Sequence, residues 1–238
     1  MPRKDQPFFG RPLPEVRDSK FAGKLFAIEG ADGSGRSTQI AQLSQWLEAN
    51  GFAVRHMGLR RSNLVAEELE DAKQGNVLTH TTLSLFYATD FFDQLVHEII
   101  PALRAGLIVL ADRYLFTALA RDAVRGVDRD WVAELYSFAV LPDITFYFRV
   151  PLEISLGRIL EGRPTLKYHE AGLDMGWSAD PYESFRIFQG KVHAEYEAMR
   201  EHCGFTLIDA TEEIHIQQAK VRQLIREKID LPAYRSRK

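Results

Sequence analysis

The residues best suited to chemistry form one glycine-rich stretch, from Gly30 to Thr38. An apolar segment typical of a buried strand, residues 25–29, precedes it, and apolar residues at helical spacing follow it. The pattern is that of a phosphate-binding loop, G-x-x-x-x-G-K-S/T, with Arg36 in place of the lysine. Inward-turned backbone N–H groups and the start of a helix suit a triphosphate, whereas the plainer alternative is a capped turn. The residues predicted to hold the phosphates are Gly30, Gly33, Ser34, Gly35, Arg36, Ser37 and Thr38.

Two residues of this pattern predict a magnesium site. The Ser37 hydroxyl is placed to bind a magnesium ion that bridges the terminal phosphates. Asp112 directly follows the apolar run 107–111, as a carboxylate that holds magnesium through water would, although aspartate also starts ordinary turns. Arg113 beside it can present its planar fork to a phosphate, or simply pair with a surface carboxylate.

A basic segment after the fourth predicted strand contains Arg158, Arg163 and Lys167 around a glycine at position 162. Mobile arginines that close over a transferring phosphoryl group stabilise its developing negative charge, and a lid excludes water. We therefore interpret residues of about 158–180 as a lid. The alternative is a solvated basic loop.

Composition narrows the class of protein. The 238 residues are 45% hydrophobic, which suits one globular domain, and the net charge of −3 gives no reason to expect nucleic acid or a membrane as partner. The single cysteine, Cys203, cannot form an internal disulfide, which fits a reducing cytoplasm. Residues 1–20 are rich in proline and mixed charges, do not resemble a secretory signal, and are expected to form an N-terminal arm before a domain at 21–238.

Predicted strands and helices alternate along the chain. Strands are expected at 25–29, 52–57, 107–111, 144–150 and 205–208, and helices at about 36–50, 63–74, 81–105, 129–140, 151–160, 182–200 and 214–229. Pro101 is expected to kink or break the long third helix. This alternation predicts an α/β fold, with a five-stranded parallel sheet covered by helices on both faces. Ligands bind such sheets beyond the carboxyl ends of the strands, which brings the glycine-rich loop, Asp112 and the basic segment to one edge.

Taken together, these motifs resemble the thymidylate kinase family over residues of about 24–229. The residues that carry the resemblance are Phe26, Glu29-Gly30, Asp32-Gly33, Gly35 and Ser37-Thr38, then Asp112-Arg113-Tyr114, then Leu141-Pro142-Asp143 and Val150-Pro151, then Arg158 and Arg163. The resemblance implies the three-layer fold of a P-loop kinase and transfer of the terminal phosphate of ATP to dTMP, with Mg2+ as cofactor.

The resemblance also implies roles for individual residues. Asp32 would lie near the sugar of the acceptor nucleotide and assist the metal site, and Arg113 would grip the acceptor phosphate. Arg36, Arg158 and Arg163 would stabilise the charge on the transferred group. Phe86 looks like the aromatic that stacks on the acceptor base, although a core aromatic is an equal alternative.

Three positions depart from the family pattern. Arg36 replaces the compact lysine by a wider, planar cation. Phe91 stands where the family usually has an arginine that donates to thymine. Arg121-Asp122 occupies the place of a Tyr-Gln pair.

These departures leave three hypotheses: an active kinase of the thymidylate kinase type, a regulatory module that binds nucleotide without catalysis and switches a partner protein, and a P-loop kinase with another small acceptor. The family also implies a possible homodimer through the long third helix. The scattered histidines predict no zinc site.

Overall fold

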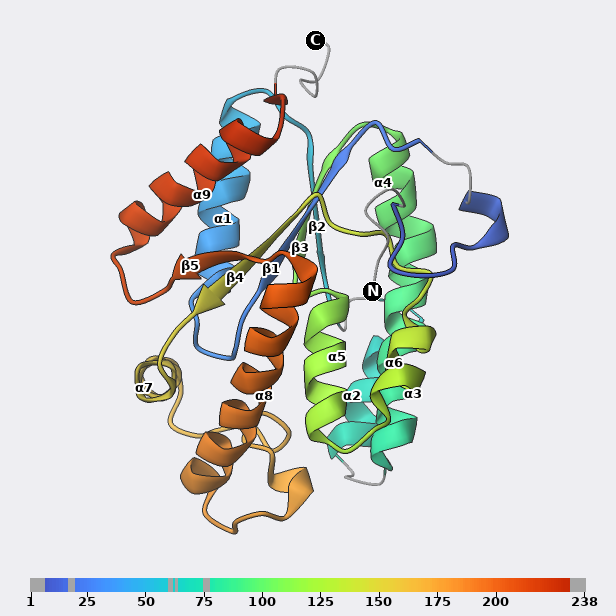
Figure 1. Ribbon diagram of the computed structural model, residues 1–238. Coiled ribbons are helices and arrows are strands. Elements are labelled where there is room, and N and C mark those ends of the chain that lie inside the picture. Colours follow the sequence, from blue (N-terminus) through green and yellow to red (C-terminus); the bar gives the residue numbers. More distant parts are fainter. Residues whose placement is uncertain (1–6, 17–19, 60–61, 63, 75–77, 232–238) are drawn as a thin grey trace.

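The computed structural model describes residues 7–16, 20–59, 62, 64–74 and 78–231. Its centre is a five-stranded sheet in the order β2-β3-β1-β4-β5, in which every neighbouring pair is parallel (Figure 1). The α/β fold predicted from the alternation of elements is therefore confirmed. The strands are β1 (Lys24–Glu29), β2 (Val54–Gly58), β3 (Ile108–Asp112), β4 (Ile144–Arg149) and β5 (Thr206–Asp209).

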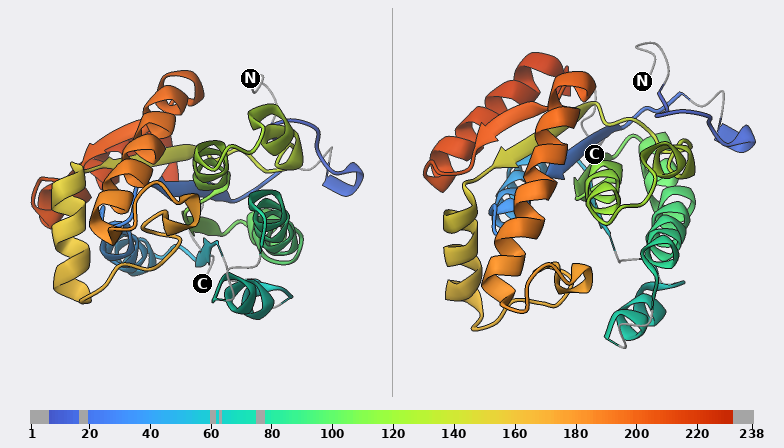
Figure 2. Two further views of the ribbon diagram at one scale, coloured as in Figure 1. Left: turned by 90° about the horizontal axis from the view of Figure 1, so that it is seen from below. Right: turned by 60° about the horizontal axis from the view of Figure 1, so that its bottom comes forward.

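Helices cover both faces of the sheet, as the views in Figures 1 and 2 show. Successive residues of β1 point to opposite faces, so Leu25 and Ala27 enter one core and Phe26 and Ile28 the other. One core is closed by α1 (Arg36–Ala49) and α9 (Ile214–Lys228). The other is closed by α3 (His80–Gln94), α5 (Leu115–Val124) and α8 (Pro181–Cys203). Burial on both faces explains why the central strands read as continuous apolar runs.

The remaining helices are shorter. They are α2 (Ala66–Gln74), α4 (Ile100–Arg104), α6 (Arg129–Leu135) and α7 (Leu152–Gly162), with 3-10 turns η1 (Pro14–Val16) and η3 (Leu173–Met175). Among the described residues, no helix has the length and apolar composition required to cross a bilayer.

Three expectations about helices need correction or completion. Helix α5 was not predicted, because it begins directly after the Asp112-Arg113-Tyr114 turn and has no side-chain cap at its start. The helix expected over 129–140 ends at Leu135, and the chain then turns toward β4. The helix expected over 63–74 begins at Ala66, and Asn63, its expected first residue, lies outside the described residues.

Pro101 distorts the long third helix without ending it. The helix runs as α3, then one π-helical turn, η2 (Leu95–Ile99), then α4. Proline has no N–H to donate to the preceding turn, and the wider π turn lies just before it. The helix therefore continues past position 101, with a local change in winding.

Part of the predicted arm docks on the domain. Phe8 forms an antiparallel bridge with Val140 and is only 2% exposed. The amides of Phe9 and Gly10 donate to the carbonyls of Ala139 and Ser137, at 2.8 and 2.7 Å. Residues 7–10 thus pair with the segment that leads into β4.

Candidate active site

The glycine-rich loop joins β1 to α1, and its close contacts require glycine. Gly33 has φ +75, and a Cβ there would lie 2.3 Å from the carbonyl oxygen of Ser155 in α7. Gly30 has φ +150, and a Cβ there would lie 2.7 Å from the Phe148 carbonyl oxygen. Since L side chains rarely adopt these conformations and no space is left for them, the loop can curl only with glycine at both positions.

Arg36 is folded into this loop. Its Nη1 lies 2.5 Å from the carbonyl oxygens of both Gly30 and Ala31 and 3.1 Å from Ser34 Oγ. Its Nε donates to Asp112 Oδ1 at 3.2 Å, and the residue is 8% exposed. The guanidinium therefore holds the loop from inside and ties it to the end of β3.

The predicted phosphate and metal residues gather at the same edge. Ser37 and Thr38 are exposed in the first turn of α1, where backbone N–H groups have no partners within the helix. Asp112 pairs in register with Ile28, next to the loop, and its side chain is 19% exposed. In the described parts of the chain, no three His, Cys, Asp or Glu side chains form a metal site. Serine and aspartate oxygens suit Mg2+ that takes its other ligands from phosphates and water.

Glu29, at the end of β1, anchors the turn that presents Arg113. The carboxylate of Glu29 is fully buried and accepts from the Tyr114 amide at 2.9 Å, Thr117 Oγ1 at 2.6 Å and Tyr196 Oη at 2.8 Å. Burial raises the pKa of Glu29, and these hydrogen bonds oppose the rise. Arg113 has φ +68, an unusual value for a residue with a side chain. Sequence reasoning missed this role, although an acidic residue that ends an apolar strand was a signal for it.

Asp32, in the loop, is the centre of a second cluster. Arg113 pairs with its Oδ1, Arg121 Nη2 lies 2.5 Å from its Oδ2, and Gln189 Nε2 lies 3.3 Å from the same oxygen. Burial alone would raise the pKa of Asp32, but the two arginines hold it below its usual range. The cluster joins the loop to Arg113 in the turn before α5, to Arg121 within α5 and to Gln189 in α8.

A cleft of about 750 Å3 opens beside this cluster. The α2–α3 pair and the segment before α8 lie toward the same end of the molecule in Figure 1, and both contribute to its walls. Five cationic and four anionic side chains line it, so cations outnumber anions only slightly. The lining residues are Asp32, Leu59, Glu70, Leu83, Tyr87, Asp112, Arg113, Arg121, Arg125, Arg163, Lys167, Tyr168, His169 and Glu170.

The structure brings most of the predicted residues to this edge. Asp32, Asp112, Arg113 and Arg163 line the cleft. Arg158 lies on the other side of the loop: its Nη2 donates to the Ala210 carbonyl at 2.9 Å, and its Nη1 is 4.0 Å from where a Cβ of residue 35 would stand.

Phe86, the aromatic predicted to stack on the acceptor base, is not the aromatic of α3 that lines the cleft. Phe86 is half-buried and does not line the cleft, whereas Tyr87, next to it on α3, does. Consecutive residues of a helix point about 100° apart, so an offset of one position decides which aromatic faces the cleft.

Ion pairs fasten the segment after α7 across the cleft. Arg125 Nε lies 2.6 Å from Asp174 Oδ2, and Arg125 Nη2 donates to the His169 carbonyl at 3.1 Å. Arg163 pairs with Glu170 within the segment itself. Arg121, Arg125, Tyr87 and Gln189 are site residues that sequence reasoning missed, because their partners lie far away in the chain.

The family model "Thymidylate kinase" matches residues 28–221, which include the loop, Asp112-Arg113 and the basic segment. The chain belongs to the thymidylate kinase family. It is 40% identical over 209 residues to "Probable thymidylate kinase 2" of Saccharolobus solfataricus, which covers 87% of this chain and 98% of that protein. It is also 30% identical over 210 residues to "Thymidylate kinase" of Thermosipho africanus, covering 84% and 96%, and 35% identical over 144 residues to "Probable thymidylate kinase" of Thermococcus kodakarensis, covering 57% and 70%.

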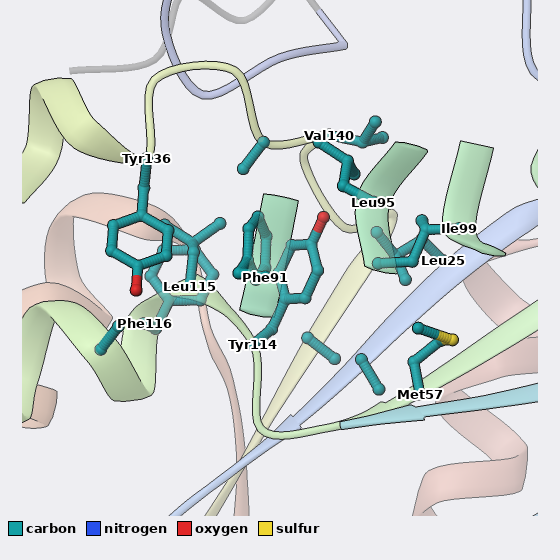
Figure 3. Packing of buried hydrophobic residues seen from close by; sticks show 14 of the residues in the cluster. Leu25, Met57, Phe91, Leu95, Ile99, Tyr114, Leu115, Phe116, Tyr136 and Val140 are labelled. Atoms are coloured by element: carbon teal, nitrogen blue, oxygen red, sulfur yellow. The ribbon is translucent and has the colours of Figure 1, made fainter. Parts of the chain in front are cut away.

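Phe91 is the departure from the thymidylate kinase pattern that the fold explains most directly. Phe91 is 3% exposed, and its ring lies 4.9 Å from the Tyr114 ring and 5.2 Å from the Tyr136 ring, measured between centroids (Figure 3). This aromatic cluster supports the base of the Arg113 turn. Position 91 therefore contributes packing and has no donor to offer a base.

Proposed function

We propose that this member of the thymidylate kinase family transfers the terminal phosphate of ATP to dTMP, giving dTDP and ADP. The observation that carries the proposal is that the glycine-rich loop and the residues at the end of β3 contact each other directly. The loop residue Asp32 binds Arg113, which the β3 end presents to the cleft, while Arg36 binds Asp112 from the same β3 end. The proposed triphosphate site and the proposed acceptor cleft thus lie side by side, at the carboxyl ends of the neighbouring strands β1 and β3.

The chain's residues divide the work by position. The loop amides, Arg36 and Arg158 would hold the triphosphate, and Arg113 would orient the acceptor phosphate for in-line attack. Arg163 would close over the transferred group, whose charge spreads over its equatorial oxygens. No covalent intermediate on the protein is needed, because positioned charge supplies the stabilisation.

We propose that Ser37 and Asp112 hold Mg2+ with the phosphates of ATP. The ion would supply positive charge that neutralises the developing negative charge on the phosphates. Asp112 would then exchange part of its contact with Arg36 for water bound to the metal. The serine hydroxyl is exposed and available for this role.

The acceptor base would stack on an aromatic of α3. Phe86 remains the prediction from the resemblance, and Tyr87 is the aromatic that the cleft itself favours. With Phe91 in the core, any donor to thymine O4 must come from another residue. The base preference is therefore best measured directly.

Release of ADP tests the proposal, with dTMP, dUMP, dGMP, AMP and CMP offered in turn as acceptors. We expect turnover with dTMP, and a large loss in Gly33→Ala, where a Cβ would meet the Ser155 carbonyl. Gly157→Ala is the matched control, because a Cβ there has open space. Nucleotide binding without transfer to any acceptor would favour the regulatory module, and turnover with a different acceptor the third hypothesis.

Two further proposals come from the same chain. Leu85 and Phe92, 45% and 41% exposed on α3, would form a homodimer face, and sedimentation of wild type against Phe92→Glu tests it.

A cytoplasmic location is proposed from the single, unpaired Cys203, and fractionation of cells tests that.

A further inference from the structure

Arg121 lies at the centre of the site but has no role in the functions given above. It belongs to α5, lines the cleft and contacts Asp32 Oδ2 at 2.5 Å. Arg113 occupies the other oxygen of the same carboxylate. Two guanidinium groups thus share one carboxylate at the boundary between the loop and the cleft.

The direct ion pairs around the cleft show why this sharing matters. Arg36 contacts Asp112, Arg125 contacts Asp174, and Arg163 contacts Glu170. At Asp32, by contrast, two cations meet one anion. The nearby Glu29 does not alter this contact pattern, because its carboxylate takes hydrogen bonds from a backbone amide and two hydroxyl groups.

Arg121 also retains an unused donor. Its Nε is buried and has no hydrogen-bond partner. A buried donor without a partner is costly, and a ligand oxygen would satisfy it. A guanidinium with one edge on Asp32 and Nε unsatisfied is suited to receive a second anion.

We propose that Arg121 is a second phosphate-binding residue for the acceptor, acting with Arg113. Asp32 holds both guanidinium groups in place until the acceptor phosphate arrives. A dianionic phosphate then balances the two cations more fully than one carboxylate does. This inference rests on the proposed function, since it concerns the acceptor side of that site.

The proposal predicts a specific pattern of affinities. Arg121 should strengthen binding of a nucleoside monophosphate but not of the corresponding nucleoside, which has no phosphate to contact. If Arg121 only positioned Asp32 or shaped the cleft, its loss would weaken both ligands alike. The ratio of the two affinities therefore separates a phosphate contact from a structural role.

Calorimetric titration of dTMP and thymidine into wild type, Arg121→Gln and Arg121→Lys measures this ratio. We expect Arg121→Gln to weaken dTMP binding roughly 10- to 100-fold, the usual range for a hydrogen-bonded charged pair, and thymidine binding by less than about threefold. Arg121→Lys keeps the charge but not the fork, so its loss for dTMP should be smaller. Arg129→Gln, on the exposed Arg129 that pairs with Glu195, is the matched control and should change neither affinity.

Equal loss of both ligands, or unchanged dTMP binding, would overturn the role of Arg121. If Arg121→Gln does not fold, the same ratio measured on Arg121→Lys decides, with a several-fold selective loss of dTMP expected. Steady-state kinetics give a second readout, because acceptor KM should rise more than kcat falls. Wild type that phosphorylates dTMP while the ratio is unchanged refutes this inference alone, whereas wild type that binds no nucleoside monophosphate refutes the proposed function with it.

Discussion

The phosphate loop and the neighbouring cleft hold their arginines by different means. In the loop, Arg36 donates to the carbonyl oxygens of Gly30 and Ala31, six and five residues away in the chain. In the cleft, Arg125 pairs with Asp174 from 49 residues further along. The loop is therefore held largely by its own backbone, whereas the cleft is held by carboxylates from other elements.

This difference has consequences for binding. Backbone carbonyls are dipoles that leave the charge of Arg36 largely in place for a triphosphate, apart from the contact with Asp112. Arg125 and Arg163 in the cleft each pair with a carboxylate, so an incoming phosphate has to compete for them, whereas Arg113 and Arg121 share Asp32. We expect the loop to depend on the presence of a cation, and the cleft to depend on which carboxylates are ionised.

Removing the cation of the loop should give the largest effect. Arg36→Met deletes both the contacts to the loop carbonyls and the charge near the triphosphate, and we expect kcat/KM to fall roughly 1000-fold, about 4 kcal/mol. Steady-state ADP release at varied ATP and saturating dTMP measures this kcat/KM for ATP. Titration of ATP should show weakened binding in the same variant.

Arg36→Lys is the informative companion to that variant. Lysine retains the cation but cannot reach the loop carbonyls and Asp112 together as the guanidinium does, so activity should stay within about tenfold of wild type. A lysine variant more than tenfold faster than wild type would show that arginine restrains catalysis, as the regulatory-module hypothesis requires.

Glu29 is the anchor that the two regions share, and its replacement should destabilise the whole fold. Glu29→Gln replaces one of the buried acceptor oxygens by an amide that faces donors, and we expect a loss of about 3 kcal/mol in the free energy of unfolding. Chemical denaturation at neutral pH measures it. Glu213→Gln, at an exposed glutamate, should change stability by less than about 0.5 kcal/mol, and an equal loss there would contradict the assignment.

The same contrast decides what the sequence could reveal. The strand, loop and helix around residues 30–38 are contiguous in the chain, so their residue types and spacing were enough to predict a phosphate-binding loop. The edge rule for parallel sheets added Asp112 and Arg113, which the structure places beside the loop. The sheet and the family followed from the same local patterns.

The walls of the cleft could not be predicted in this way. The partners of Arg121 and Arg125 are 89 and 49 residues away, and nothing in the local pattern marks such pairs. Helix α5 carries Arg121, and Arg125 directly follows its last residue; the helix starts without a side-chain cap, so its beginning gave no signal. The structure gives the positions of the predicted site residues, and their roles in binding and catalysis stay predictions, those of the loop and Asp112-Arg113 as much as those of Phe86, Arg158 and Arg163.

The buried carboxyl of Asp122, next to Arg121 in α5, should give a pH dependence of stability of moderate size. Burial raises the pKa of Asp122 to about 6, above its ordinary value, so the folded state holds a proton that the unfolded chain loses near pH 4. Stability should therefore fall as pH rises from about 4 to 6, and the loss should persist above that window. Asp122→Asn cannot ionise, so relative to wild type it should gain about 2 kcal/mol between pH 4 and pH 7. Denaturant unfolding of both proteins across this pH range measures the difference. If their free energies of unfolding change with pH in the same way, the raised pKa of Asp122 is contradicted.

Arg163, on the rim of the cleft, should show the smallest effect. Its side chain is 30% exposed and pairs with Glu170, so solvent screening and that carboxylate weaken its electrostatic attraction to a phosphate. We expect Arg163→Met to lower kcat about tenfold with little change in acceptor KM, because the contact would form only when the segment closes over the transferred group. Arg186→Met removes an exposed arginine that also pairs with a carboxylate, Glu153, away from the cleft, and should leave kcat unchanged. A larger effect at Arg163 than at Arg36 would reverse the contrast between the two regions, because it would make the carboxylate-held cleft, and not the carbonyl-held loop, the main source of positive charge for transfer.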